Sequence, residues 1–330
     1  MPDHTADQQD IDLPVDAVVI GRNEGKRLEK CLISLQKQVR RLIYVDSGSS
    51  DGSVENALSL GAEIVELDLA RPFTAARARN AGLAALAESN DGGLVQFVDG
   101  DCEVDADWLT KACAFLSAHE DVAVVCGRRR EQHPETSVYN RLCDAEWDTP
   151  VGETLACGGD ALMRLEAIRA LKGYRESLIA GEEPELCLRL RHQGWRIWRL
   201  DAEMTRHDAQ ITRFGQWWRR TRRAGHAFAE GAALHGAPPE RHWVRETRRA
   251  VMWGALLPMS LLAGILGSPW CLAALAAYPV QVLRLARTMG WESAFFNVLG
   301  KFPECIGVVE YRWNRIRGRS RNILEYKATD

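Results

Sequence analysis

The sequence lacks several patterns that mark common functional classes. Its nine cysteines contain no Cys-x-x-Cys pair, which argues against a zinc site and a disulfide framework and favours a reducing compartment. No Gly-x-Gly-x-x-Gly follows the first apolar run, and no Gly-x-x-x-x-Gly-Lys loop is present, so neither a dinucleotide site nor a P-loop is expected. A formal net charge of −3 over 330 residues gives no basis for a nucleic-acid binder.

Charged residues are also missing from the stretch 250–283. Gly267-Ser268-Pro269 divides this apolar block into two arms, each shorter than the ~20 residues of a comfortable membrane-spanning helix. Arginines flank both ends of the block and arginine favours the cytoplasmic side, so we expect a membrane-associated hairpin on the cytoplasmic face, the inner membrane in a bacterium. It would form two short spans or a re-entrant wedge. The alternative is a buried helical hairpin on a soluble core.

The first residues are polar and acidic and hold no positive segment before an apolar core, so we expect no secretory signal. Beyond them, short apolar runs alternate with helical patterns. The strand-like runs are 16–20, 42–46, 63–67, 94–99 and 122–127, and helices are expected between them and over 160–171, 183–193 and 211–234. This alternation predicts an α/β fold with a doubly wound, mostly parallel sheet that binds ligands beyond the carboxyl ends of its strands. We expect a flexible segment over 1–14, an α/β domain over 15–235 and a helical region over 236–330.

Two carboxylates, Asp99 and Asp101, follow the apolar run 94–98 with Gly100 between them. Hard cations such as Mg²⁺ or Mn²⁺ prefer carboxylate oxygens and are commonly completed by substrate phosphates. Asp-Gly is also ordinary turn chemistry, and acids at strand ends are often only solvated. The segment therefore indicates a divalent-cation site only together with further residues.

The segment 46–53, Asp-Ser-Gly-Ser-Ser-Asp-Gly-Ser, also follows a strand-like run. Its small and acidic residues leave room for a nucleotide, with a carboxylate to accept from a base or a ribose hydroxyl. The same residues are favourable helix caps and turn formers. In the small-residue helix that precedes residue 94, Arg77 or Arg79 could reach a diphosphate, or could lie on a solvated face.

Glu182 and Glu183 begin the amphipathic stretch 183–193, with Pro184 suited to a first helical turn. Acids at a helix N-terminus complement the helix dipole, which explains them structurally. A carboxylate held at the edge of a rigid element near an acceptor is also what a general base requires.

Taken together, these segments resemble the inverting family-two glycosyltransferases, which have the GT-A fold. The resemblance covers roughly residues 15–225. It rests on 19–24 in the first strand, on 46–53, on Arg79-Asn80-Ala81-Gly82, on Asp99-Gly100-Asp101, on Gly158-Gly159-Asp160 and on Glu182-Glu183, where the family usually has Glu-Asp.

The resemblance implies a metal-dependent enzyme that moves a sugar from a nucleotide-sugar donor, UDP-sugar on family grounds, to an acceptor hydroxyl. Glu183 or Glu182 would be the base, and Mg²⁺ or Mn²⁺ would be held at Asp99, Asp101 and His207. The remaining implied donor-site residues are Arg22, Glu24, Asp46, Ser47, Asp51, Arg79, Asp99 and Gly159.

The basic, aromatic run 213–223 is typical of a helix on a membrane surface. Its arginines could clamp a lipid-linked diphosphate, so we expect an acceptor sugar on a polyprenyl carrier, as in bacterial surface-polysaccharide assembly. Two alternatives remain. One is a sugar nucleotidyltransferase, although its glycine-rich activating loop is absent, and the other is a non-catalytic membrane scaffold with a relic fold.

Overall fold

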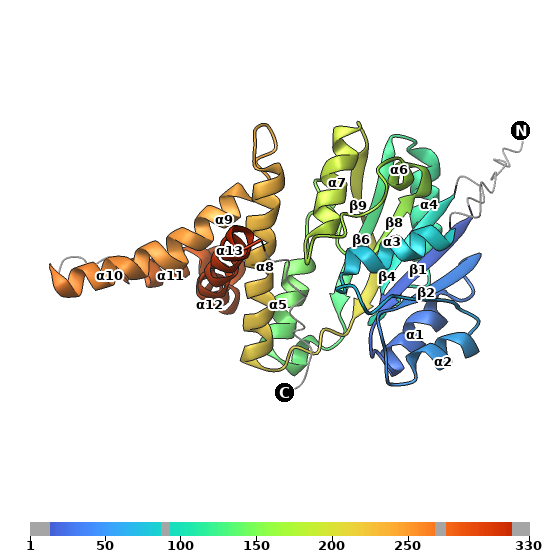
Figure 1. The fold of residues 1–330 in the computed structure, drawn as a ribbon, viewed down its shortest axis with the longest axis horizontal. Coiled ribbons are helices and arrows are strands. Elements are labelled where there is room, and N and C mark those ends of the chain that lie inside the picture. The colour runs from blue at the N-terminus through green and yellow to red at the C-terminus, as the bar shows by residue number, and fades with distance from the viewer. Residues whose placement is uncertain (1–13, 87–92, 268–274, 319–330) are drawn as a thin grey trace, which may run out of the picture.

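The computed structural model describes residues 14–86, 93–267 and 275–318. One mixed sheet with flanking helices forms an α/β body, and the C-terminal helices form a separate layer beside it (Figure 1). The expected segment 1–14 lies almost wholly outside the described residues, as do Ser268, Pro269 and the last twelve residues.

The sheet has the strand order β3-β2-β1-β4-β8-β6-β9-β5, with β7 paired to β9. Its first part is parallel, as predicted, and consists of β1 (Val15–Gly21), β2 (Arg41–Asp46), β3 (Glu63–Glu66) and β4 (Leu94–Asp99). Its register aligns the strand ends, because Gly21 lies opposite Asp46 and Ile20 lies opposite Asp99. The acidic segments therefore meet at one edge of the sheet.

The helices of the body alternate with these strands as expected. α3 packs against β1 and β2, and α4 packs against β6. They are α1 (Lys26–Leu35), α2 (Ser53–Ser59), α3 (Ala75–Ala85), α4 (Trp108–Ala118), α5 (Val138–Trp147), α6 (Leu165–Ala170) and α7 (Glu182–His192).

The helix predicted over 160–171 is wrong in its first half. Residues Ala161–Arg164 form β8, which lies antiparallel between β4 and β6. Its three apolar side chains are fully buried, so the gain from sheet pairing and burial outweighs local helical preference. Antiparallel pairing also involves β5 (Cys102–Val104) and β7 (Gly152–Thr154), while β6 (Val122–Glu131) runs parallel to β9 (Arg196–His207).

The C-terminal layer begins with α8 (Phe214–His235), close to the helix expected over 211–234. It continues through α9 (Val244–Val251), a π-helical turn (Met252–Leu256), α10 (Leu257–Leu266), α11 (Ala277–Met289), α12 (Trp291–Leu299) and α13 (Lys301–Ile316). α10 and α11 project from the molecule as an arm (Figure 1). Within the described residues, every helix is too short or too polar to cross a bilayer.

Candidate active site

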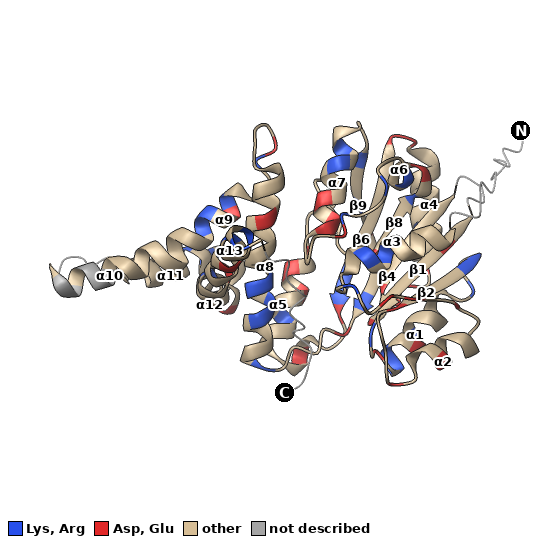
Figure 2. Cartoon of the chain, viewed as in Figure 1, with Lys and Arg blue, Asp and Glu red and all other residues tan. Residues whose placement is uncertain are grey.

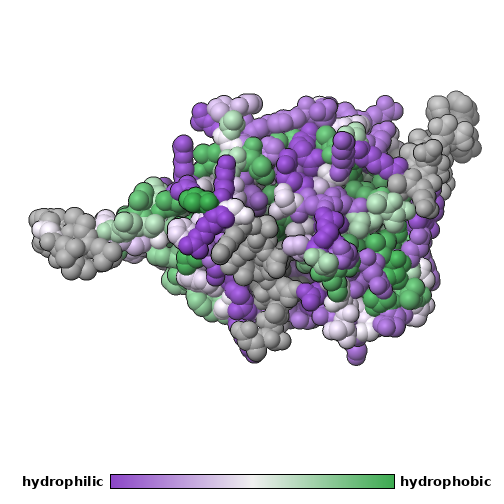
Figure 3. Space-filling view, viewed as in Figure 1, coloured by the Kyte–Doolittle hydropathy of each residue, from purple (hydrophilic) through white to green (hydrophobic). Residues whose placement is uncertain are grey.

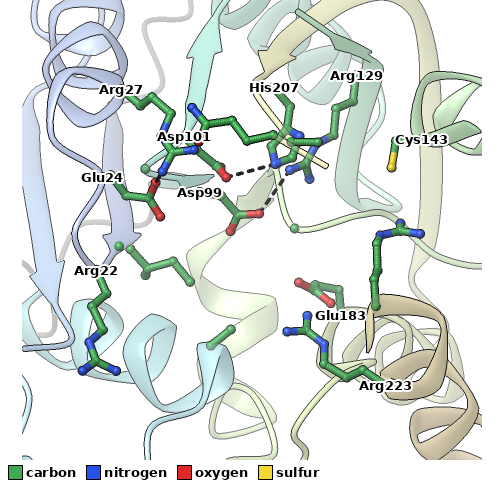
Figure 4. Close-up of a pocket in the computed structure, with 18 of the residues that line it drawn as sticks. Arg22, Glu24, Arg27, Asp99, Asp101, Arg129, Cys143, Glu183, His207 and Arg223 are labelled. Atoms are coloured by element: carbon green, nitrogen blue, oxygen red, sulfur yellow. Dashed lines mark hydrogen bonds and ion pairs between the residues drawn. The ribbon is translucent and has the colours of Figure 1, made fainter. Parts of the chain in front are cut away.

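A cleft of about 710 Å³ opens beyond the carboxyl ends of β1 and β4. It is closed on its other sides by the beginning of α7 and by α8, which contributes Arg220 and Arg223 (Figure 4). Nine residues singled out in the sequence line it: Arg22, Glu24, Arg79, Asp99, Asp101, Gly159, Glu182, Glu183 and His207. Residues from six separate stretches of the chain thus meet in one cavity.

Asp101 and His207 form a buried pair in this cleft. The Nε2 atom of His207 lies 3.1 Å from an oxygen of Asp101, and both side chains are about 6% exposed. The pairing of β5 with β9 puts His207 opposite Cys102. Behind the imidazole, Nδ1 lies 3.8 Å from the buried Glu131.

These residues fit a divalent cation. Ligand atoms of Asp101, Cys102 and His207 lie within 4.8 Å of one another. A carboxylate and an imidazole are ligands for Mn²⁺ and similar ions, and a carboxylate behind a ligating histidine fixes the orientation of its ring. The Nδ1 atom of His207 has no hydrogen-bond partner among the described residues, so Glu131 is placed to take that role when the ring carries a proton there.

Asp99 is engaged by arginines instead. Its two oxygens accept hydrogen bonds from Arg79 (2.8 Å) and Arg129 (3.3 Å). Burial alone would raise the pKa of Asp99, but the two guanidinium groups outweigh it and lower that pKa. The structure therefore brings Asp101 and His207 together. Asp99 lies beside them as an ionised carboxylate paired with two guanidinium groups.

Arg79 joins the acidic strand end to the start of α7. Besides Asp99, its guanidinium pairs with Glu182 and Glu183, each at 2.8 Å. Burial and the neighbouring Glu182 carboxylate raise the pKa of Glu183 to about 7, against the lowering effect of Arg79. A carboxylate with such a pKa is suited to proton transfer near neutral pH.

Gly159 has no side chain, and the side chains of Arg79, Asp99 and Glu183 fill the space beside it. A Cβ atom added there would lie 2.7 Å from Arg79 Nη2, 2.9 Å from Asp99 Oδ2 and 3.3 Å from Glu183 Oε1. Any side chain at this position would displace the arginine bridge, in which Arg79 pairs with Asp99 at the strand end and with Glu183 at the start of α7. Gly159 therefore lines the cleft and makes room for these three side chains, and its role at the donor site stays a prediction.

The expected nucleotide residues Asp46, Ser47 and Asp51 are not among the described residues that line the cleft. Asp46 accepts hydrogen bonds from Tyr44 and from the backbone of Gly48 and Ser49, each at 2.8 Å. The carboxylate of Asp51 accepts from the amide and hydroxyl of Ser53 at the start of α2. In this structure both acids shape the loop through local hydrogen bonds, as turn-forming residues do, while the N-cap of α2 is Gly52, without a side-chain cap.

The sequence did not single out Arg129, which lines the cleft, and named Asp160 only within the segment Gly158-Gly159-Asp160, without a role. Arg129 lies over the ring of Trp147, 4.8 Å from its centroid, and the same indole contacts His207. Asp160 is fully buried and accepts from the backbone N–H of Asp99 (3.0 Å) and the hydroxyl of Thr205 (2.8 Å). The only sequence signal for Arg129 was its position in an arginine triplet at the end of a strand.

Comparison with known proteins bears on this site. Residues 16–168 match the family model for glycosyl transferase family 2. The succinoglycan biosynthesis protein ExoA of Rhizobium meliloti is 30% identical over 185 residues, which are 53% of this chain and 56% of ExoA. A pre-mycofactocin glycosyltransferase of Mycobacterium tuberculosis is 29% identical over 302 residues, which are 86% of this chain and 60% of the relative.

Solved structures agree on the fold. The mannosyltransferase PcManGT of Pyrobaculum calidifontis, solved with GDP-Man and Mn²⁺, superposes with a TM-score of 0.62 at 17% identity, over 92% of this chain and 88% of that one. Glucosyl-3-phosphoglycerate synthase of Mycobacterium tuberculosis gives a TM-score of 0.50 at 19% identity, over 69% and 81%. Residues 16–168 are thus similar to glycosyl transferase family 2, and the sheet of this chain has the GT-A arrangement.

Proposed function

We propose that this protein transfers a sugar from a nucleoside-diphosphate donor to an acceptor hydroxyl, with inversion and with a divalent cation. The observation that carries the proposal is that Glu183, with its pKa near 7, shares one cleft with the Asp101–His207 pair. Arg79 connects the two sides of that cleft. A base and a site for an anionic leaving group are the two parts that one direct displacement requires.

Glu183 takes the proton of the acceptor hydroxyl as that oxygen attacks the anomeric carbon. Arg79 holds the Glu183 carboxylate at 2.8 Å, and Asp160 fixes the end of β4 through the backbone of Asp99. Asp101 and His207 would hold the cation, which when bound neutralises charge on the departing diphosphate. Attack from the face opposite the nucleotide gives inversion of the anomeric configuration.

For the acceptor we propose a lipid-linked phosphate or diphosphate at the cytoplasmic face of a membrane. Arg220 and Arg223 of α8 line the cleft on the side of Glu183, and Figure 4 shows Arg223 pointing toward that carboxylate. Guanidinium groups bind phosphate oxygens well. Figure 2 shows basic residues along α8 and α9, next to the apolar arm, which is the combination that anionic lipid surfaces attract. ExoA, by its name, acts in succinoglycan biosynthesis, which supports an acceptor of this kind.

The test is a panel of nucleotide sugars with Mn²⁺, offered with a polyprenyl-phosphate sugar, a free sugar and a glycosylated peptide. We expect release of a nucleoside diphosphate and preference for the lipid-linked acceptor. Release of pyrophosphate would instead indicate a nucleotidyltransferase, and equal activity on the free sugar would contradict the proposed acceptor. If the protein neither turned over a donor nor bound a nucleotide, the result would favour the alternative of a non-catalytic scaffold.

Metal dependence has its own variant. Asp101→Asn keeps the shape of the side chain but removes the charge that the cation needs, so Mn²⁺ should no longer raise the melting temperature in the presence of UDP. Asp107→Asn is the matched control, because Asp107 is 74% exposed at the start of α4 and lies outside the lining of the cleft. Equal stabilisation of both variants by Mn²⁺ would contradict the assignment of Asp101.

A further inference from the structure

The helix that carries Glu182 and Glu183 is held along its length by the chain segment 235–243, which connects α8 to α9. At the first turn of α7, Trp243 lies against Gly181. Further along, His235 pairs with Glu185 at 3.1 Å. At the far end, Glu240 pairs with His192 and Arg191 at 3.0 and 3.3 Å. We call residues 235–243 the α7 brace.

Trp243 occupies a slot made by two glycines. A Cβ atom at Gly181 would collide with the indole, and so would one at Gly231 of α8. The edge of the slot is completed by Phe228, whose ring centroid lies 5.4 Å away, and by His242, which stacks on the indole at 4.3 Å. Trp243 itself has a left-handed backbone with φ of 51°, a conformation that costs energy for a bulky residue and persists only where the surroundings enforce it.

The position of this contact matters because Gly181 is the N-cap of α7, with φ of 84° and no side chain of its own to cap the helix. Glu182 and Glu183 follow it directly. A ring packed on Gly181 therefore limits how far the first turn can move. The buried Glu185 adds a second fixed point, since it accepts from Arg175, Arg189 and His235.

We propose that Trp243 is a positioning residue for the reaction. Through Gly181, it holds the first turn of α7 so that the carboxylate of Glu183 stays aligned with the acceptor. This inference rests on the proposed function. The brace lies outside the region 16–168 that matches the family model. The proposal therefore gives the C-terminal part of this chain a role in positioning the base.

Trp243→Ala should lower kcat by about 10–100-fold, because a small displacement of a reacting group has an effect of this size. The dissociation constant for UDP with Mn²⁺ should change less than about twofold, since Asp99 and Asp101 lie on the opposite wall. Trp243→Phe refills part of the slot and should recover most of the rate. Trp291→Ala is the matched control, because it removes an indole that is 64% exposed on α12.

Hydrogen exchange tests the same contact without activity. In Trp243→Ala, amides 185–188 of α7 should exchange faster while those of β4 stay protected. His235→Ala, which removes the contact of the brace with Glu185, should give the same pattern more weakly and covers the case in which Trp243→Ala fails to fold. The proposal would be overturned if Trp243→Ala weakened UDP binding by the same factor as it lowered kcat and also lowered the melting temperature, because that pattern indicates general unfolding. Unchanged hydrogen exchange in α7 would overturn it as well. A wild type that transfers no sugar refutes the proposed function alone, and the exchange data still decide the brace.

Discussion

At the scale of a single residue, the raised pKa of Glu183 predicts how kcat depends on pH. Burial and Glu182 raise its pKa to about 7, and a general base works only in its ionised form. We therefore expect kcat to rise with pH through about 7. Glu183→Gln should lower kcat by about 10²–10⁴-fold and remove that rise, with UDP binding nearly unchanged. The check is a pH–rate profile of both proteins, and a variant that keeps the same acidic limb would show that another group is the base.

The same shift has a consequence for stability. In the unfolded chain Glu183 ionises near its ordinary pKa of 4.5, whereas in the folded protein it ionises at about 7. Between these values the folded state binds more protons, so the contribution of Glu183 to stability falls as pH rises. Glu183→Gln lacks this loss and should gain melting temperature relative to wild type more at pH 8 than at pH 5. An equal difference at both pH values would contradict the shifted pKa.

Gly159 allows a test of the arginine bridge with a close control. Gly159→Ala places a methyl group against Arg79, Asp99 and Glu183, so we expect a fall in kcat of about 100-fold from misplaced groups. Gly158→Ala adds the same methyl group where nothing lies within 4 Å. It should keep near wild-type activity. Equal losses in both variants would point to the flexibility of the loop and away from the bridge.

At the scale of elements, the parallel half of the sheet was predictable because β1, β2 and β4 are short, mostly apolar runs, each ending at or directly before polar residues. β8 was not, since four residues ahead of a helical pattern carry no periodicity of their own. The site follows the same division. Strand ends gave Asp99 and Asp101, whereas the ion pair of Arg129 with Asp160 depends on pairings of β6 and β8 that only the folded chain establishes.

The packing of α8 on α13 gives a prediction for these two helices. Cβ atoms added at Gly225 of α8 or Gly307 of α13 would meet backbone atoms of the other helix, which cannot yield as a side chain can. Gly225→Ala should therefore lower the melting temperature even though alanine favours helix. Gly215→Ala on the same helix meets only Arg219, at 3.7 Å, and should be neutral or stabilising. Similar melting temperatures for the two variants would contradict close packing at Gly225.

At the scale of the whole molecule, exposed large apolar side chains gather in the C-terminal layer. Leu256, Met259 and Val280, on or beside the arm, are each about 60% exposed, and Figure 3 shows apolar colour along the arm. Apolar surface of this extent marks an interaction site in a folded protein. The cleft is bounded by α8, which leads through the brace into α9 and the arm. One continuous piece of chain therefore connects the arm to the wall of the cleft.

Cosedimentation with vesicles tests the proposed surface. The variant carrying Leu256→Glu and Val280→Glu should bind vesicles containing phosphatidylglycerol about 100-fold more weakly, because burial of two large aliphatic side chains contributes several kcal/mol. A matched pair, Leu58→Glu and Leu69→Glu, adds the same charge at positions 57% and 70% exposed on the α/β body. That pair should bind as wild type does, apart from a small loss from added negative charge. If both double variants lost vesicle binding equally, net charge would govern attachment. If neither lost vesicle binding, the arm would not be the membrane-binding surface.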